Sequence, residues 1–409
     1  MRSILNVSVL SICVSFALIV SCASMQQQDD ETAFVDNFPR TGIAPEKNPF
    51  IHASGRDLVD AKGKKIILRG IAFGNDVWSN PADSPKTHHT GKDFEHCKSL
   101  GINSIRFYLN YRIFEDDAAP YTYKESGFAV LDKNIEWAKA NGIYLILNIH
   151  VPQGGFQSNA EGGDLWNYRE NQKRFTALWK EIARRYKNES TILGFDILNE
   201  PVVTRDLSQW ERLAKETVAA IREHDPQHII IVERLNAVII SPDNTDWNEN
   251  RNGDMNFFTI NDTNVMYEFH FYKPMQFTHQ GASWIWPLKN ISTVYPGQFT
   301  DWDGSEKTGN RELLEQELAP YIAFGMSHNV PLYLGEFGVI RKGFEGNRNG
   351  VGWVRDMIDI AAAHNINISY HAYHETAFGL FSNDVSNLPD NPNKPLEELF
   401  REKFKEKGK

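Results

Sequence analysis

Two glutamates in this chain each come near the end of a short apolar run, where a buried strand would stop. Glu200 lies in residues 194–201 (GFDILNEP), and Glu336 lies in residues 332–338 (LYLGEFG). A single carboxylate at such a point is often a helix N-cap or one half of a loop ion pair. Two carboxyl groups that face each other across a cleft can instead hydrolyse a glycosidic bond, one as acid/base and one as nucleophile. A nucleophilic mechanism predicts carboxyl groups roughly 5–5.5 Å apart.

The elements around these glutamates predict how the two side chains meet. β-branched runs at 143–149, 192–198, 229–232, 265–271 and 332–337 alternate with helical periodicity at 128–140, 168–186, 207–223, 311–325 and 352–364. This alternation indicates parallel strands with helical crossovers, and eight such units fit a (β/α)8 TIM barrel that forms a single catalytic domain. All strands of such a barrel end at one face, so Glu200 and Glu336 are expected to meet there.

The contexts of the two glutamates resemble those of glycoside hydrolase family 5, the cellulase family A enzymes. In that family the glutamate of Asn-Glu-Pro is the general acid/base and the glutamate of Gly-Glu-Phe-Gly is the nucleophile, which here implies Glu200 and Glu336. The resemblance covers residues 51–381, and residues 51–65 match a hairpin-like lead-in that plugs the bottom of the barrel. Matched strand motifs imply supporting roles for Arg106, His150, Asn199, His270 and Tyr272. Arg106 and Tyr272 are expected to keep Glu336 ionised, and Asn199 to hydrogen-bond a sugar hydroxyl.

The segment expected as the last strand departs from the family pattern. The family usually ends this strand with a tryptophan that forms the floor of the sugar site, whereas residues 368–375 (ISYHAYHE) contain no tryptophan. An aromatic ring stacks on the C–H face of a sugar, so Tyr373 or His374 is expected to replace it with less area. The long stretch 273–309 contributes Trp284, Trp286 and Trp302 as further candidate sugar platforms, with packing inside the loop as the alternative.

Composition and motifs exclude several classes of partner and enzyme. The formal net charge of −10 argues against nucleic acid or an anionic membrane surface as a partner, and favours a neutral polysaccharide. The chain has no H-E-x-x-H motif, and His88 and His89 are expected to be a solvated pair, so no metal or cofactor is expected. No G-x-G-x-x-G follows the first strand and no G-x-S-x-G occurs, which disfavours a dinucleotide-binding fold and an esterase.

The N-terminal sequence predicts where in the cell the protein is located. Met1 and Arg2 precede an apolar stretch over 4–20, and residues 19–22 (IVSC) resemble a bacterial lipobox in which Cys22 is acylated. Residues 1–21 are therefore predicted to be a lipoprotein signal peptide, residues 22–45 a polar tether, and residues 46–409 the catalytic domain. An ordinary signal peptide or an uncleaved anchor is the alternative. Only Cys97 then remains in the mature domain, where a small buried side chain is expected.

These observations predict a retaining, endo-acting β-glycosidase that hydrolyses a β-1,4-linked polysaccharide, most simply a glucan. β-Mannanase, xylanase or other β-glycan hydrolase activity remains open within the same family. A lipoprotein that binds glycans at the cell surface without turnover is the alternative from another class. We expect a monomer held at the bacterial cell envelope, at the outer membrane, only through its lipid anchor.

Overall fold

Eight apolar runs of the sequence form a closed barrel of parallel strands in the computed structural model, which describes residues 49–77, 88–158, 162–241, 243–382 and 391–405. In barrel order the strands are β4 (Arg69–Phe73), β5 (Ser104–Asn110), β8 (Tyr144–Val151), β9 (Ile192–Asp196), β11 (Ile229–Glu233), β14 (Val265–Phe271), β17 (Leu332–Phe337) and β18 (Asn367–Tyr370). Each pairs in parallel with its neighbours, and β18 closes the barrel by pairing with β4. The predicted (β/α)8 fold is thus confirmed.

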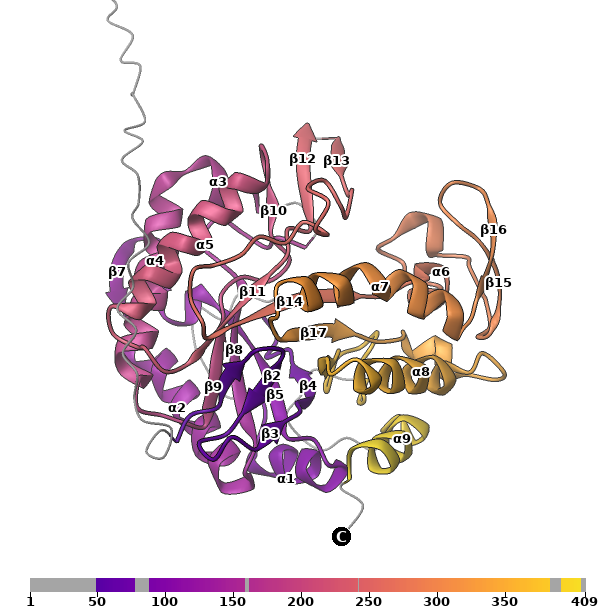
Figure 1. The fold of residues 1–409 in the computed structure, drawn as a ribbon, viewed down its shortest axis with the longest axis horizontal. Coiled ribbons are helices and arrows are strands. Elements are labelled where there is room, and N and C mark those ends of the chain that lie inside the picture. The colour runs from indigo at the N-terminus through magenta and orange to yellow at the C-terminus, as the bar shows by residue number, and fades with distance from the viewer. Residues whose placement is uncertain (1–48, 78–87, 159–161, 242, 383–390, 406–409) are drawn as a thin grey trace, which may run out of the picture. The chain divides into compact units, whose positions relative to one another are not determined.

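Helices connect most of these strands and surround them (Figure 1). The long ones are α1 (Gly91–Leu100), α2 (Glu125–Asn141), α4 (Arg169–Tyr186), α5 (Leu207–Arg222), α7 (Arg311–Ser327), α8 (Gly350–Ala363) and α9 (Lys394–Phe404). Two shorter helices are α3 (Gly163–Asn167) and α6 (Met275–Thr278). The helices bury one apolar face each against the barrel, and Cys97 of α1 is fully buried there, as expected for a small apolar side chain.

The inward-facing side chains of the strands change character from one end of the barrel to the other. Successive side chains of a strand alternate between its two faces, so residues two apart share the barrel interior. On β14 this face holds Met266, Glu268 and then His270, and the last two approach each other within 3.3 Å. On β8 it holds Ile146, Asn148 and His150. The interior is therefore apolar near the strand starts and ionisable near the strand ends, where barrel enzymes place their chemistry.

The lead-in hairpin joins the apolar end of this interior. β1 (His52–Ser54), β2 (Asp57–Val59) and β3 (Lys65–Ile66) form a small antiparallel sheet before β4. Leu58 of β2 is 1% exposed and packs in one cluster with Ile146, Ile231 and Met266 from the barrel strands. The structure thus places this hairpin as the plug that the sequence predicted.

One crossover departs from the expected alternation. Between β11 and β14 the described residues contain no helix, but β12 (Ala237–Ser241) and β13 (Asn244–Asp246) followed by irregular turns. Asn and Asp side chains bond the backbone of nearby residues here, as Asn248 accepts from the Asn250 amide and Asn252 from the Asp254 amide. Such side chains compete with helical hydrogen bonds, which explains the turns.

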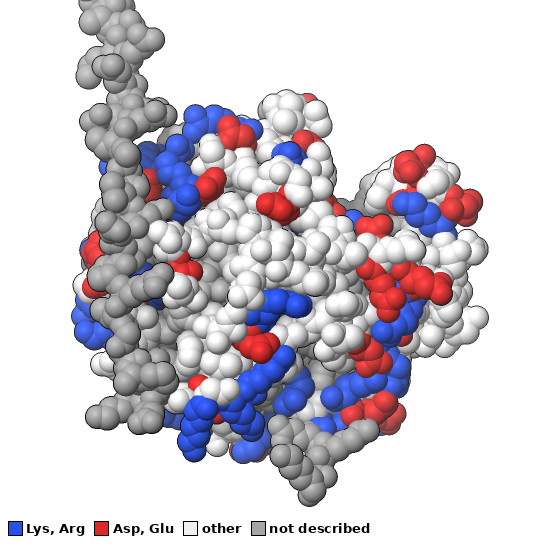
Figure 2. Space-filling model, viewed as in Figure 1, with Lys and Arg blue, Asp and Glu red and all other residues white. Residues whose placement is uncertain are grey.

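Small strand pairs extend the loops beyond the barrel. β12 pairs with β10 (Val202–Val203) and β13, β15 (Gly297–Thr300) pairs with β16 (Glu306–Gly309), and β6 (Glu115–Asp116) pairs with β7 (Ala119–Tyr123). In Figure 1 the β12–β13 and β15–β16 pairs project beyond the helices, and Figure 2 shows an indented outline between them. On the face shown, positive and negative side chains are interspersed rather than separated.

The predicted signal peptide, the predicted lipidation site Cys22 and the whole predicted tether lie outside the described residues. Within the described ranges, no helix has both the length and the apolar character that a membrane crossing requires.

Candidate active site

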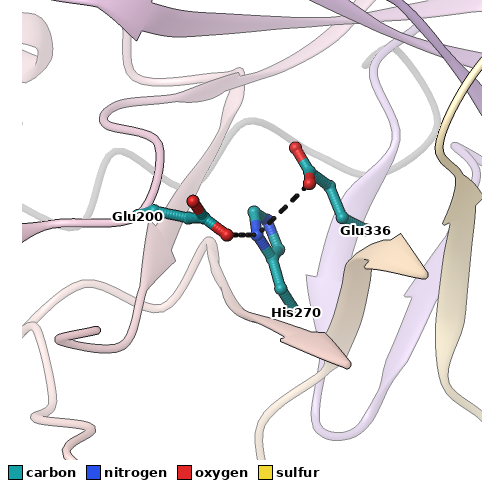
Figure 3. A group of neighbouring side chains, drawn as sticks. All are labelled: Glu200, His270 and Glu336. Carbon is teal, nitrogen blue, oxygen red and sulfur yellow. Dashed lines mark hydrogen bonds and ion pairs between the residues drawn. The ribbon is translucent and has the colours of Figure 1, made fainter. Parts of the chain in front are cut away.

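Glu200 and Glu336 meet at the ionisable end of the barrel. A carboxylate oxygen of each, together with a ring nitrogen of His270, falls in a group whose atoms all lie within 4.8 Å of one another. Figure 3 shows His270 between the two carboxylates, with Glu336 on a neighbouring strand. An oxygen-to-oxygen approach within this limit fits carboxyl groups roughly 5–5.5 Å apart, as in an acid/base and nucleophile pair, better than the roughly 6.5–9.5 Å of an inverting pair.

Glu200 lies in the loop that follows β9, with a backbone conformation that side chains seldom adopt. Its φ is +41°, in the left-handed region, which costs of order 1–3 kcal/mol unless the surroundings hold it. The Glu200 amide donates to the Glu233 carboxyl at 2.6 Å, and the amide of the preceding Asn199 donates to the Ile149 carbonyl at 3.1 Å. These contacts fix the loop so that the Glu200 side chain points to the centre of the site.

Three side chains donate hydrogen bonds to Glu336, which lies near the end of β17. Arg106 Nη1 and the Tyr108 hydroxyl approach one oxygen at 2.7 and 2.6 Å, and the Tyr272 hydroxyl approaches the other at 2.9 Å. A carboxylate that accepts several such bonds is oriented and favoured in its charged form. The sequence-predicted residues Arg106 and Tyr272 thus both contact Glu336, and Tyr108 joins them.

The surroundings of Glu336 keep it ionised. Burial alone would raise the pKa of this carboxyl, but the basic groups around it outweigh burial and hold the pKa well below its usual value. In order of effect these groups are His270, His371, Arg106 and His150. A carboxylate that stays charged over the ordinary pH range is what a nucleophile requires.

His270 links the two carboxylates. Its Nδ1 lies 2.9 Å from a Glu200 oxygen and 3.6 Å from a Glu336 oxygen, and its Nε2 lies 3.3 Å from Glu268. Burial lowers the pKa of His270, but the charges of Glu233 and Glu336 and the hydrogen bonds to Glu200 and Glu268 raise it well above its usual value. Both ring nitrogens therefore donate, and His270 supplies a positive charge between the acid/base candidate and the nucleophile candidate.

A layer of buried acidic residues supports the site from below. Arg106 Nε donates to Asp196 at 2.7 Å, and its Nη2 lies 3.1 Å from Glu268. Burial raises the pKa of Asp196 well above its usual value against the attraction of Arg106, and the adjacent Glu268 raises it further. A raised pKa favours the protonated form of Asp196, which reduces the buried negative charge. Gly335 makes room for this layer, since a Cβ there would lie 1.6 Å from a Glu268 oxygen.

Two sets of three side chains in the site have the spacing of metal ligands. They are Glu200, His270 and Glu336, and Glu233, Glu268 and His270. Both need a free lone pair on His270, whose two nitrogens instead donate to carboxylates. Protonated His270 and Arg106 supply the cationic charge at this point, so we assign no metal to the site.

The other predicted site residues divide into two sets. His150 stacks on Tyr108 with ring centroids 3.9 Å apart, and Asn199 accepts from Arg106 Nη2 at 3.1 Å. Tyr373 and His374 lie elsewhere: the Tyr373 hydroxyl bonds His96 of α1 at 3.0 Å, and His374 Nε2 lies 3.5 Å from Asp93 of the same helix. The ring that the segment after β18 places beside Glu336 is instead His371, with Nδ1 at 4.0 Å from a carboxylate oxygen. The expectation that Tyr373 or His374 lines the sugar site is corrected by this placement.

Sequence reasoning missed Tyr108, Glu233, Glu268 and His371. Tyr108 and Glu268 each lie two residues from a predicted site residue on the same strand, so the period of two could have found them. Glu233 ends an apolar strand in the way that Glu336 does. His371 has no comparable signal, because four aromatic or imidazole side chains follow each other closely in residues 370–374 and only their packing separates them.

Of the candidate platform tryptophans, Trp284 lies near the site, whereas Trp286 is the more exposed of the two. Trp284 is 59% exposed, and its ring lies 6.5 Å from Phe378, which lies 5.7 Å from Tyr272. The ring of Phe378 thus lies between the exposed indole of Trp284 and Tyr272, which contacts Glu336. Trp286 is 85% exposed, in a 3₁₀ turn between α6 and β15.

A parallel barrel with two close carboxylates at its strand ends defines a retaining-type glycosidase site. The chain belongs to glycoside hydrolase family 5, since the family described as cellulase (glycosyl hydrolase family 5) matches residues 59–377. The predicted family and the class of glycoside hydrolase are thereby confirmed.

Similar proteins with established descriptions share most of the chain. Endoglucanase C of Acetivibrio thermocellus is 32% identical over 314 residues, which cover 73% of this chain and 88% of the relative. Cellodextrinase A of Ruminococcus flavefaciens is 26% identical, covering 67% of this chain and 76% of the relative. Cel5A of Thermotoga maritima in complex with cellobiose superposes with a TM-score of 0.63 at 25% identity, covering 82% of this chain and 97% of that structure.

Proposed function

We propose that the protein is a retaining endo-β-1,4-glucanase. The observation that carries this proposal is the pair of carboxylates within 4.8 Å, with Glu336 charged and fixed by three donors. The similar proteins support the substrate class: the first is described as an endoglucanase, and Cel5A was solved with cellobiose.

Each step of a double displacement then has a side chain in place. Glu200 protonates the glycosidic oxygen while Glu336 attacks the anomeric carbon, so the old C–O bond breaks and a glycosyl ester forms. Glu200 next takes a proton from water, which attacks the same carbon and releases Glu336. Arg106, Tyr108 and Tyr272 hold Glu336 throughout, and positively charged His270 orients Glu200.

The direct test is incubation with a panel of β-1,4-glucan, mannan and xylan, with detection of new reducing ends and of product lengths. The proposal expects rapid loss of glucan chain length and a first product that keeps the β configuration in proton NMR. Faster cleavage of mannan would assign a mannanase, a candidate favoured by the Cel5A structure that was solved with mannotriose. Binding without any new reducing ends would assign a glycan-binding protein and overturn the proposal.

We propose further that Cys22 is lipidated and that the domain reaches outward from the cell envelope on a polar tether. The motivation is the IVSC sequence that closes the apolar run, followed by the acidic and glutamine-rich stretch 26–31. Labelling with a fatty-acid analogue should mark the wild type, and Cys22→Ser should be unlabelled and absent from the membrane fraction. An unlabelled wild type, or a mutant that stays in the membrane fraction, would contradict this proposal.

A further inference from the structure

His371 lies beside the nucleophile candidate and contacts it through one intermediate. Its Nδ1 is 3.0 Å from the Tyr108 hydroxyl, which is 2.6 Å from Glu336, and the same Nδ1 lies 4.0 Å from the second Glu336 oxygen. His371 is 8% exposed. The three side chains come from the ends of three barrel strands and form a short hydrogen-bonded chain.

The number of protons fixes the direction of this chain. A charged carboxylate can only accept, so the single proton of the Tyr108 hydroxyl is directed at Glu336. Burial and the neighbouring Glu336 raise the pKa of Tyr108 well above its usual value, so the phenol keeps that proton. The phenol oxygen accepts a longer contact from Arg106 Nη1 at 3.3 Å, and at the His371 contact it can only accept as well, which requires the proton of His371 on Nδ1. His371 donates to Tyr108, and Tyr108 donates to Glu336.

The backbone and a neighbouring ring hold His371 in this position. Its amide donates to the Phe337 carbonyl at 2.9 Å, directly after Glu336 in the chain. A Cβ on Gly338 would lie 2.5 Å from the His371 carbonyl oxygen, so this close approach depends on glycine. Phe378 packs against the imidazole at 5.7 Å between ring centroids. The ring is therefore set by both its strand and its neighbour.

We propose that His371 is a positioning residue that directs the Tyr108 hydroxyl toward Glu336 and thereby orients the nucleophile. This inference rests on the proposed function, in which Glu336 attacks the sugar. Without the Nδ1 donor, the Tyr108 hydroxyl can turn away and donate elsewhere, and Glu336 loses both an orienting bond and part of its stabilisation as an anion. His371 acts through Tyr108, so its loss should change the nucleophile more than substrate binding.

The predicted signature is a change in pH dependence. Weaker hydrogen bonding to the charged form raises the pKa of Glu336, so the acid limb of kcat/KM moves to higher pH. The other titratable and charged groups that face Glu336 or His371 are all retained in the variants, although the loss of His371 removes its lowering effect on the pKa of His150 and of His279. They are Arg106 on β5, His150 on β8, Glu200 after β9, His270 and Tyr272 at the end of β14, and His279, whose pKa burial and the nearby His371 lower to about 3.

The test compares His371→Phe, which keeps a ring but removes the donor, with His371→Asn, whose amide nitrogen can occupy the Nδ1 position. The substrate is 2,4-dinitrophenyl β-cellobioside, whose leaving group needs no protonation, so the acid limb reports the nucleophile. His371→Phe should lower kcat/KM by roughly tenfold and move the acid limb up by roughly one pH unit, values that follow from the loss of one charge-assisted bond. His371→Asn should stay within roughly threefold of wild type.

A double-mutant cycle with Tyr108→Phe completes the test. If His371 acts through Tyr108, adding His371→Phe to Tyr108→Phe should cause little further loss. Equal losses of kcat/KM in His371→Phe and His371→Asn, or an acid limb that does not move in His371→Phe, would overturn the proposal. His371 would then act only through the packing of its ring. A wild type that cleaves neither this glycoside nor any polysaccharide of the panel would instead overturn the proposed function.

Discussion

At the scale of single residues, the site depends on what each side chain can donate or accept. Glu336 receives three hydrogen bonds and stays charged, whereas Glu200 contacts a positively charged His270 and has to exchange a proton during the reaction. Two chemically identical side chains therefore receive different roles from their neighbours. These roles are separately testable.

Glu336→Gln should abolish hydrolysis while the fold persists, because an amide of nearly the same volume cannot attack the anomeric carbon. We expect kcat on an aryl β-cellobioside to fall by at least about 10³-fold, or about 4 kcal/mol in barrier. Glu345→Gln is the matched control, since its side chain is 69% exposed on the same segment of chain, and it should retain full activity. Turnover of Glu336→Gln within about tenfold of wild type would show that Glu336 is not the nucleophile.

Glu200→Ala should lose activity on natural glycans but respond to azide with activated substrates. Without the acid, only a good leaving group departs, and without the base, water attacks the glycosyl-enzyme slowly. Azide needs no base, so it should accelerate turnover of the dinitrophenyl glycoside and yield a β-glycosyl azide detectable by mass spectrometry. Glu336→Gln in the same assay should show no such rescue to a β product, and absence of rescue in Glu200→Ala would count against the acid/base role.

At the scale of elements, the loops after the strands widen the site into a surface for a longer substrate. The segment between β14 and α7 carries Trp284, whose ring is connected through Phe378 to Tyr272. An indole exposed over 59% of its surface on the strand-end face suits the apolar face of a further sugar unit.

Trp284→Ala should therefore raise KM for cellohexaose by roughly threefold to tenfold, the loss of one stacking contact, while kcat/KM for a short aryl cellobioside stays unchanged. Met326→Ala is the control, because Met326 is 58% exposed at the C-terminal end of α7, which lies toward the strand starts. An unchanged KM for cellohexaose in Trp284→Ala would remove Trp284 from the substrate path.

At the scale of the whole molecule, the residues that stabilise the barrel and the residues that could do chemistry lie at opposite ends of its axis. The strand starts form an apolar cluster that the β1–β2 hairpin closes, and the strand ends carry the buried charges. Stability arises mainly where apolar surface is buried, whereas the charged layer is retained for reactivity and is costly to desolvate.

Leu58→Ala should lower the free energy of unfolding by about 2–5 kcal/mol, because it removes a side chain that is 1% exposed and leaves a cavity in the plug. Urea denaturation measures this loss, and kcat at a temperature well below the transition should not change. Lys64→Ala in the same hairpin, an exposed position, should shift stability by less than about 0.5 kcal/mol. An equal kcat loss in Leu58→Ala would show that the two ends of the barrel are not independent.

The sequence by itself determined the alternation of strands and helices, because hydrophobic period and turn residues are local properties. It predicted β14 and β17 with their observed bounds, and it located both glutamates, since a carboxylate that ends an apolar run is visible in one dimension. The alternation that it predicts is interrupted between β11 and β14, where Asn and Asp side chains bond the local backbone.

The tertiary structure alone decided which ring of the last strand segment reaches the nucleophile. Tyr373 and His374 bond or pair with α1, a helix far away in sequence, and this packing leaves His371 to face Tyr108 and Glu336. It likewise decided that the pKa of Glu336 is held well below its usual value while that of Asp196 is raised well above it. A side chain's charge depends on burial and on neighbours from other strands, and those neighbours exist only once the barrel has closed.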